Sequence, residues 1–567
     1  MLDWLQQKIG QRSSHPMNSP AEAARLLAEL PLDEPIKAVE EVAAWLESLA
    51  SATSFSTASR LKVISMVDEA GQPCAELLLA EYLEGEARGA AGRFKQWQVL
   101  SDFWERLADA YQLVALQIEI SQRGELTEQT TLVVVRGMRA VATQMRLGFM
   151  RYSGETGRLW KALYHLYSLA HAQRRAGVPV RPYPWDTAST TARLELVRAV
   201  MLESAAPQSL PPREIELTAR IAARLAGSFG YGEAPAPALT HYLDLAQSNA
   251  PAPVTDKLQP SATLRFFGPG TTAVRVKEML DGLQGLPGGV AERFGDEFKA
   301  AEKIEVLKRL QLYWSDQPPR RVHARARLNN NVDVVFGLGS ICSKIGRSEP
   351  SMPLEASEKF DIDMGGDEAP AEAPAASAIE TWKLTDISLG GLGATTPRRA
   401  HGALKIGALM AFRIAGTDKW SVGIVRRLQA DAQKLSRVGA EIFSKAPQLL
   451  QLKKLGYRQD EAWNWEVRDQ KQKSLQVFTD AVLLPPGGGQ QGSLLFAPES
   501  YFPEESFGVM IDKQPRKLQV ADVLEKGDGF ERVAFQWLAA DSPPRAGPTS
   551  ESKPTTRNGG LSNGQQE

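Results

Sequence analysis

The chain has 567 residues, of which 43% are hydrophobic and 23% are charged; these are proportions of globular protein, with roughly two to four domains at this length. They exclude a chain that is disordered throughout. The formal net charge of −1 excludes a global basic field that would draw the chain to nucleic acid or anionic lipid. The only two cysteines, Cys74 and Cys342, exclude a disulfide scaffold and a four-cysteine zinc site.

The N-terminus lacks the positive start and the apolar run of a signal peptide. No stretch reaches the ~18 uninterrupted apolar residues of a membrane-spanning helix. A first helix could touch a membrane through Leu2, Trp4, Leu5 and Ile9, but a helix docked on the protein itself is the preferred interpretation. We therefore expect a cytoplasmic protein without a transmembrane segment.

The first half of the chain has the periodicity of helices. Pro35 follows two acidic residues, a good helix start, and the apolar residues after it recur at three to four positions up to Leu49. Similar stretches lie at 90–120, 127–150, 155–174, 190–204 and 212–226. We predict a helical domain over residues 1–255, closed in part by an Ala- and Pro-rich segment at 233–253.

A connecting segment is predicted over residues 256–314. It contains a short strand at 263–267 and a helix from about Ala273. A second helix is predicted from about Gly289 to Trp314, ending before Pro318 and Pro319, because the residue before a proline disfavours helical geometry.

After these prolines the pattern becomes that of strands separated by Gly-rich turns. A β-domain is predicted over residues 315–447, with strands at 332–336, 382–387, 404–414, 420–425 and 438–443. It is interrupted at 348–380 by an acidic stretch rich in Ala, Pro and Ser, a composition that predicts a disordered loop.

A further β-rich domain is predicted over residues 448–540. Its strands are expected at 477–484, 493–496, 507–511, 518–523 and 530–537. Residues 541–567 have the composition of a disordered tail. The predicted fold class is therefore α+β and multidomain, with a helical first half followed by two β-rich regions.

Four arginines stand between the last predicted helix and the first strand of the β-domain: Arg320, Arg321, Arg325 and Arg327. In an extended chain side chains alternate, so the last three of them would share one face. Guanidinium groups bind acceptors that lie side by side, such as phosphate oxygens or O6 and N7 of guanine.

A second group of polar residues ends the strand at 382–387. The carboxylate of Asp386 can accept hydrogen bonds from the N1–H and N2–H edge of guanine, and the hydroxyl of Ser388 can donate to a phosphate oxygen. Glycines such as Gly391 let the backbone approach an anion closely. With the arginines, these groups suit a ligand that carries guanine bases and phosphates.

The spacing Arg321-x-x-x-Arg325 followed by Asp386-x-Ser388-x-x-Gly391 resembles the paired signature of PilZ domains, which are receptors for cyclic di-GMP. The resemblance covers about residues 315–447, and the strand at 436–443 is similar to the closing strand of the PilZ barrel. One departure is that the acidic stretch separates the two motifs. A surface insertion need not disrupt a barrel, because the cost of loop closure grows slowly with length.

The resemblance implies an antiparallel β-barrel and a ligand site. Arg321 and Arg325 would hold phosphates and guanine edges, and Arg320 would assist them. Asp386 would bind a guanine edge, Ser388 a phosphate, and Gly391 would allow close approach. These six residues are the predicted cyclic di-GMP site.

The function implied by the resemblance is reception of cyclic di-GMP without chemistry. Binding would order the arginine segment and change a conformation or a partner surface, with motility, pili, exopolysaccharide or biofilm as outputs. We expect no enzyme activity, no metal and no cofactor besides the ligand cyclic di-GMP. The helical half is expected to bind a protein partner, and no nucleic acid is expected.

Three alternatives remain open. The first is a PilZ-like adaptor that binds proteins but no nucleotide, although the intact motif argues against it. The second is an enzyme in the helical half, which a substrate-sized cleft lined with carboxylates or histidines would favour. The third is a nucleic-acid binder, which the near-zero net charge disfavours.

Overall fold

The computed structural model describes residues 15–84, 89–121, 127–154, 156–290, 294–319, 324–346, 379–397, 404–430, 435–455, 478–485, 492–511 and 514–538. The chain divides into two compact units. The helical unit comprises residues 1–324 together with 393–406 and 426–439. The barrel unit comprises residues 325–392, 407–425 and 440–567.

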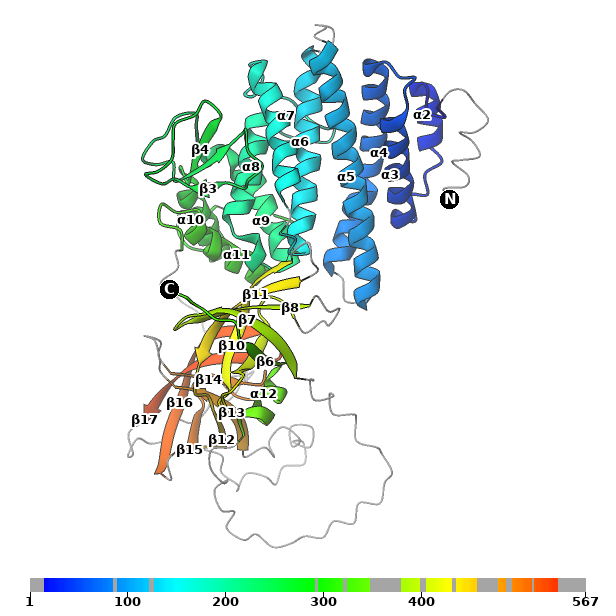
Figure 1. Ribbon diagram of the computed structural model, residues 1–567. Helices are drawn as coiled ribbons and strands as arrows, with labels where there is room; N and C mark the ends of the chain where they lie inside the picture. Colours follow the sequence, from blue (N-terminus) through cyan, green and yellow to red (C-terminus); the bar gives the residue numbers. More distant parts are fainter. Residues whose placement is uncertain are drawn as a thin grey trace, which may run out of the picture. The chain divides into compact units, whose positions relative to one another are not determined.

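Long helices that run side by side form most of the helical unit (Figure 1). Those packed in succession along the chain are α4 (Thr57–Glu84), α5 (Gly89–Ser121), α6 (Thr127–Met150) and α7 (Gly157–Ala172). Their connections are short, which makes consecutive helices antiparallel neighbours. The flanking helices are α2 (Pro20–Leu27) and α3 (Pro35–Ser51) beside α4, and α8 (Ala192–Ser204) and α9 (Pro212–Leu225) beside α6.

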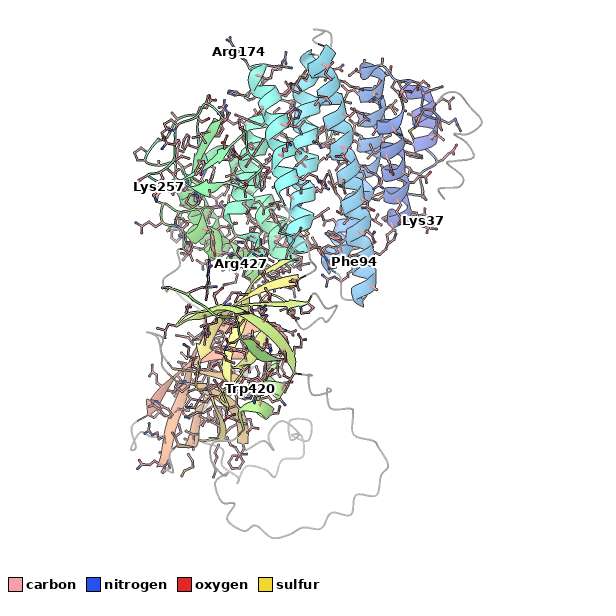
Figure 2. All side chains as sticks on the ribbon, viewed as in Figure 1. Lys37, Phe94, Arg174, Lys257, Trp420 and Arg427 are labelled. Atoms are coloured by element: carbon pink, nitrogen blue, oxygen red, sulfur yellow. The ribbon has the colours of Figure 1, made fainter. Side chains whose placement is uncertain are left out.

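Side chains fill the space between these helices (Figure 2), and many of the buried ones are aromatic. Five that are almost completely shielded from solvent are Phe103, Tyr111, Trp160, Tyr164 and Tyr167. Burying a large apolar side chain contributes roughly 1.5–3 kcal/mol to folding. The helical unit is therefore held by a core that runs continuously from α2 to α11 (Ala300–Tyr313).

The predicted helices are confirmed to within a few residues at both ends for α3 and for α5 to α9. Helix α4 and the short α2 were not predicted. The helix predicted from Gly289 is wrong at its start, since α11 begins only at Ala300. The backbone of Gly295 has a φ of 112°, a conformation that no residue in a right-handed helix adopts.

A small antiparallel sheet follows α9 and corrects the interpretation of residues 233–253 as merely a closing segment. Its order is β1 (Gly230–Gly232), β4 (Leu264–Gly268), β2 (His241–Asp244) and β3 (Ala252–Pro253). The predicted strand at 263–267 is confirmed as β4, which is buried along its whole length. Gly268 is required there, because a Cβ would lie 1.9 Å from the carbonyl oxygen of Ala238. Helix α10 (Thr272–Leu283) follows as predicted.

The next sheet closes on itself. Its strands are β5 (Ala326–Arg327), β6 (Asn331–Phe336), β7 (Glu380–Ile387), β8 (Gly391–Pro397), β9 (Leu409–Ile414), β10 (Ser421–Ala430) and β11 (Leu435–Ser444). The order is β5-β7-β6-β9-β10-β11-β8, and β7 also pairs with β8. That last pairing closes six strands into an antiparallel barrel and leaves β5 as an extra strand on β7. The predicted strands are confirmed, whereas β5 and β8 were not predicted as strands.

A second closed barrel follows and belongs wholly to the barrel unit, whereas parts of β8, β10 and β11 of the first barrel are assigned to the helical unit. Its strands are β12 (Gln448–Lys454), β13 (Phe478–Leu484), β14 (Ser493–Phe496), β15 (Ser506–Ile511), β16 (Gln514–Gly527) and β17 (Phe530–Leu538). They pair in the order β12-β13-β14-β17-β16-β15 around buried Phe496 and Phe507. The α+β multidomain class predicted from the sequence is confirmed, and only β12 was missed among these strands.

Several predictions fall outside the described residues. They concern the first helix at Leu2–Ile9, the acidic stretch apart from residues 379 and 380, and the tail at 541–567. Arg320 and Arg321 also lie outside them. Within the described residues, no helix is long and apolar enough to cross a membrane.

Candidate functional site

The short strand β5 brings the arginine segment beside the end of β7. In the register of this antiparallel pair, Arg327 stands opposite Asp386 and Ala326 opposite Ile387. Since side chains alternate, Arg325 projects to the same side as Arg327. The guanidinium of Arg325 donates a hydrogen bond from Nη1 to Oδ1 of Asp386 and forms an ion pair with it.

This ion pair remains open to water. The side chains of Arg325 and Asp386 are 31% and 26% exposed. Oδ2 of Asp386 accepts from the hydroxyl of Thr385 at 3.2 Å. A partly exposed ion pair contributes about 0–1 kcal/mol to stability, so a ligand can compete for either partner at little cost.

A tight turn carries the chain from β7 to β8. The backbone N–H of Ser388 donates to the carbonyl oxygen of Gly391 at 2.8 Å, and its hydroxyl donates to the same oxygen at 3.2 Å. The carbonyl oxygen of Gly390 accepts from the backbone N–H of Ile442 in β11 at 3.0 Å. The turn is thus fixed both by its own serine and by the neighbouring strand.

Gly391 lies where the predicted groups converge. A Cβ on it would lie 3.6 Å from Oγ of Ser388 and 3.7 Å from Nη2 of Arg325. The carbonyl oxygen of Ala440 would be only 3.3 Å away, so the backbone is closely approached on that side. Four of the six predicted site residues therefore meet in one small region, although Arg325 and Asp386 are far apart in the sequence.

Two features of this region were not assigned to the predicted site. Arg327 faces Asp386 directly, and the alternation of side chains that groups it with Arg325 was a signal for it. Ala440 contributes only a carbonyl oxygen, for which a sequence carries no signal. For Arg320 and Arg321, the assignment to the site stays a prediction.

A second arginine–aspartate pair in the same barrel provides a contrast. Nη2 of Arg413 lies 2.9 Å from Oδ2 of Asp333, and the two side chains are 34% and 26% exposed. Hydrogen bonds from Arg413 lower the pKa of Asp333. The guanidinium also lies 5.1 Å from the ring centre of Trp420, which Figure 2 labels. This pair matches the first in exposure, and the further contacts of its side chains are with Thr381 and Trp420.

The groups at Gly391 can hold a ligand by complementary contacts. The guanidinium offers donors in a fixed fork for phosphate or guanine acceptors. The carboxylate accepts from N–H edges, and the hydroxyl can donate to an anion once it leaves the Gly391 carbonyl. The described residues contain no group of three or more His, Cys, Asp or Glu side chains able to hold a metal ion, and both cysteines are free thiols.

The helical unit contains a groove of about 600 Å³ between α4 and the helices α8 and α9, with α6 along its floor. A cleft lined with carboxylates is the feature that would favour an enzyme in the helical half, and this groove is such a cleft. Its lining contains no histidine, cysteine or serine. Glu76 and Glu84 are about 12 Å apart along α4, beyond the roughly 5–9.5 Å of catalytic carboxylate pairs in glycosidases. The other lining acids, Asp186, Glu195, Glu216 and Glu297, are ion-paired with arginines.

Comparison with known proteins gives one match. Residues 21–232 match the family model described as the N-terminal domain of the cyclic-di-GMP receptor FimW. The match covers somewhat more than a third of the chain and lies wholly in the helical part, apart from the region that resembles PilZ domains. No curated protein matches the chain significantly.

Proposed function

We propose that this protein is a receptor for cyclic di-GMP whose site is built by Arg325, Asp386, Ser388 and Gly391. Arg320 and Arg321, which precede β5, complete it. The observation that carries the proposal is the convergence of these groups around Gly391, where Arg325 Nη2 and Ser388 Oγ lie within 4 Å of the Cβ position. The motif predicts a ligand with guanines and phosphates, and the geometry supports it.

The match of residues 21–232 to the N-terminal domain of a cyclic-di-GMP receptor supports the same ligand from another part of the chain. The two indications are independent, because one rests on the helical domain and the other on a motif in the barrel. The finer assignment of the barrel to the PilZ family rests on the motif and on the closed antiparallel sheet.

Ligand binding would exchange contacts at the Arg325–Asp386 pair. A phosphate or a guanine acceptor edge takes the guanidinium of Arg325, and the carboxylate of Asp386 accepts from a guanine N–H edge. The ion pair that is given up is partly exposed and therefore weak. In the free protein, Asp386 holds Arg325 beside Gly391 and thus keeps the site partly organised.

The receptor mechanism we propose acts at one of the points where the chain passes from one unit to the other. The first of these points falls between Ala324 and Arg325, inside the arginine segment. A ligand held by Arg320, Arg321 and Arg325 would restrict that segment on both sides of the boundary. The ligand shifts the equilibrium between two arrangements of the units only if it binds one arrangement more tightly than the other. The output, such as motility, pili, exopolysaccharide or biofilm, would follow from a partner that senses this change.

The test is isothermal titration of the full chain with cyclic di-GMP. We expect micromolar or tighter binding that is lost in Arg321→Ala/Arg325→Ala. The matched control is Arg413→Ala, which removes an arginine–aspartate pair of nearly equal exposure from the same barrel. It should leave the affinity unchanged.

Equal loss of affinity in the double variant and in Arg413→Ala would mean that the barrel is perturbed generally, and the assignment of the site would fail. No binding by the intact protein would instead favour the adaptor that acts through protein contacts alone.

A further inference from the structure

The groove in the helical unit has a floor of small side chains. It follows α4 from Gln72 to Glu84, which corresponds to about 18 Å of helix. Its alanines come from all four helices: Ala75, Ala80, Ala142, Ala199, Ala219 and Ala223. Small residues allow another backbone to approach closely. At one end Trp185, which is 48% exposed, stacks on Tyr183 with ring centres 5.1 Å apart.

The positive charges that line the groove are already neutralised by the protein. Arg139 pairs with Asp186 and Glu195, Arg146 with Glu216, Arg198 with Glu195, Arg213 with Glu302, and Arg220 with Glu216 and Glu297. An anionic ligand would have to displace these acids. The groove therefore does not favour a second phosphate-bearing ligand.

Two lining carboxylates differ from the rest. Glu76 and Glu84 project from α4 into the groove, and neither forms an ion pair with another described residue. Burial by neighbouring protein raises the pKa of Glu76, while Arg220 and Arg146 oppose the shift. The groove thus presents two exposed carboxylates that feel the charge of nearby arginines but form no close ion pair within the described residues.

The opposite wall also holds polar atoms that lack partners. Glu216 is only 3% exposed, and its Oε2 makes no hydrogen bond, although Nη1 of Arg146 lies 3.1 Å away. Nε of Arg146 and Nε of Arg198 are likewise buried without an acceptor. Because these atoms are shielded from solvent, they belong to the interior of the groove wall and not to the surface that a docked group would contact.

We propose that this groove docks an amphipathic helix of a partner protein that carries two basic side chains seven or eight residues apart. The apolar side of that helix lies on the alanine floor, with a large residue against Trp185. Its basic side chains reach Glu76 and Glu84, since seven to eight residues of helix span about 10–12 Å. The groove length accommodates about three turns, the size of a helix-in-groove interface.

The probe is a displayed library of helical peptides of about five turns, selected against the full chain. We expect enriched sequences to carry Lys or Arg at the stated spacing beside an apolar stripe. The best synthetic peptide is then titrated by fluorescence anisotropy. Glu76→Lys/Glu84→Lys should weaken its binding by tenfold or more, and a version of the peptide with Glu in place of its basic residues should bind that variant better.

Two further variants separate the groove from the rest of the surface. Ala142→Phe fills the floor and should also weaken binding. Asp33→Lys makes the same kind of charge change at an exposed position outside the groove, and should leave binding unchanged. The thermal unfolding of all variants is compared with that of the parent. If Ala142→Phe does not fold, the test still rests on Glu76→Lys/Glu84→Lys, because both positions are exposed.

Several results would overturn the proposal. Enrichment of acidic peptides, or of peptides whose binding is unaffected by Glu76→Lys/Glu84→Lys, would do so. An affinity raised by Lys8→Glu/Arg12→Glu would assign the groove to the N-terminal segment of the chain itself. Self-association that the charge reversal abolishes would assign it to a second copy.

Discussion

Two arginine–aspartate pairs, one in each unit, occupy opposite environments. In the helical unit, Asp68 is fully buried and the side chain of Arg136 is 4% exposed. Asp68 accepts hydrogen bonds from Gln72 at 2.7 Å, from the hydroxyl of Tyr111 at 2.7 Å and from that of Tyr183 at 3.4 Å. In the barrel unit, the pair of Arg325 and Asp386 is about a third and a quarter exposed.

Burial gives the two pairs different roles. Burial raises the pKa of Asp68. The hydrogen bonds that its carboxylate accepts and the positive charge of Arg136 both oppose that shift. Arg136 also donates to the carbonyl oxygen of Pro182 and to Glu69. Every strong contact is internal, so this pair fastens α4 to α6 and to the loop before α8. The Arg325–Asp386 pair is partly exposed to water. Each of its two side chains can therefore exchange the other for a group of the ligand.

The largest effect is expected from breaking the buried pair. Arg136→Met leaves the Asp68 carboxyl buried without its cation, and it should lower the free energy of unfolding of the helical unit by about 3–5 kcal/mol. Calorimetry or urea unfolding measures the change. Arg158→Met is the control, because its pair with Glu105 is largely exposed and should contribute about 0–1 kcal/mol. Equal effects of both variants would refute the distinction between the pairs.

A second prediction concerns buried acids that lack the full set of partners of Asp68. Burial raises the pKa of Glu203 and of Glu214 to about 7, from an ordinary value of 4.5, and Oε2 of Glu203 has no hydrogen bond. Because the folded pKa lies above the unfolded one, their stabilising contribution is complete below about pH 4.5 and is lost as the pH rises to about 7.

Replacing these acids should therefore flatten the pH dependence of stability. At pH 8, each of Glu203→Gln and Glu214→Gln should raise the free energy of unfolding by about 2 kcal/mol, less than the full shift implies, because the side chains keep some contact with water. At pH 4 the gain should vanish. Urea unfolding at both pH values measures it, with exposed Glu22→Gln as control. A gain that is the same at both pH values would contradict titration as its cause.

The sequence predicted most helices but missed α4, which has several polar residues on its buried side. Helix α4 contains Pro73 and has Arg60, Asp68 and Gln72 on its buried side. A proline and buried polar groups disrupt the apolar period from which helices are predicted. Only the tertiary network around Asp68 makes this pattern compatible with a long helix.

The candidate sites differ in the same way. Asp386, Ser388 and Gly391 lie at or beside the turn from β7 to β8, and Arg325 belongs to a compact motif, so a local pattern predicted residues that the fold then brings together. The groove could not be predicted, because its lining comes from seven separate segments between Gln72 and Phe298. No spacing along the chain records such a juxtaposition.

The smallest effect on stability, and a selective one on binding, is expected from Gly391→Ala. The new Cβ would lie 3.3 Å from the carbonyl oxygen of Ala440, so the strands must separate by a few tenths of an ångström, at a cost of about 1 kcal/mol, the low end for overpacking. It also intrudes between Arg325 and Ser388, where we place the ligand. Titration should show about tenfold weaker binding of cyclic di-GMP, equal to about 1.4 kcal/mol.

Gly339→Ala is the control, since no atom lies within 4 Å of its Cβ position. If Gly391→Ala binds as tightly as the parent while Arg321→Ala/Arg325→Ala does not, the ligand is held by the arginines without close approach to this turn.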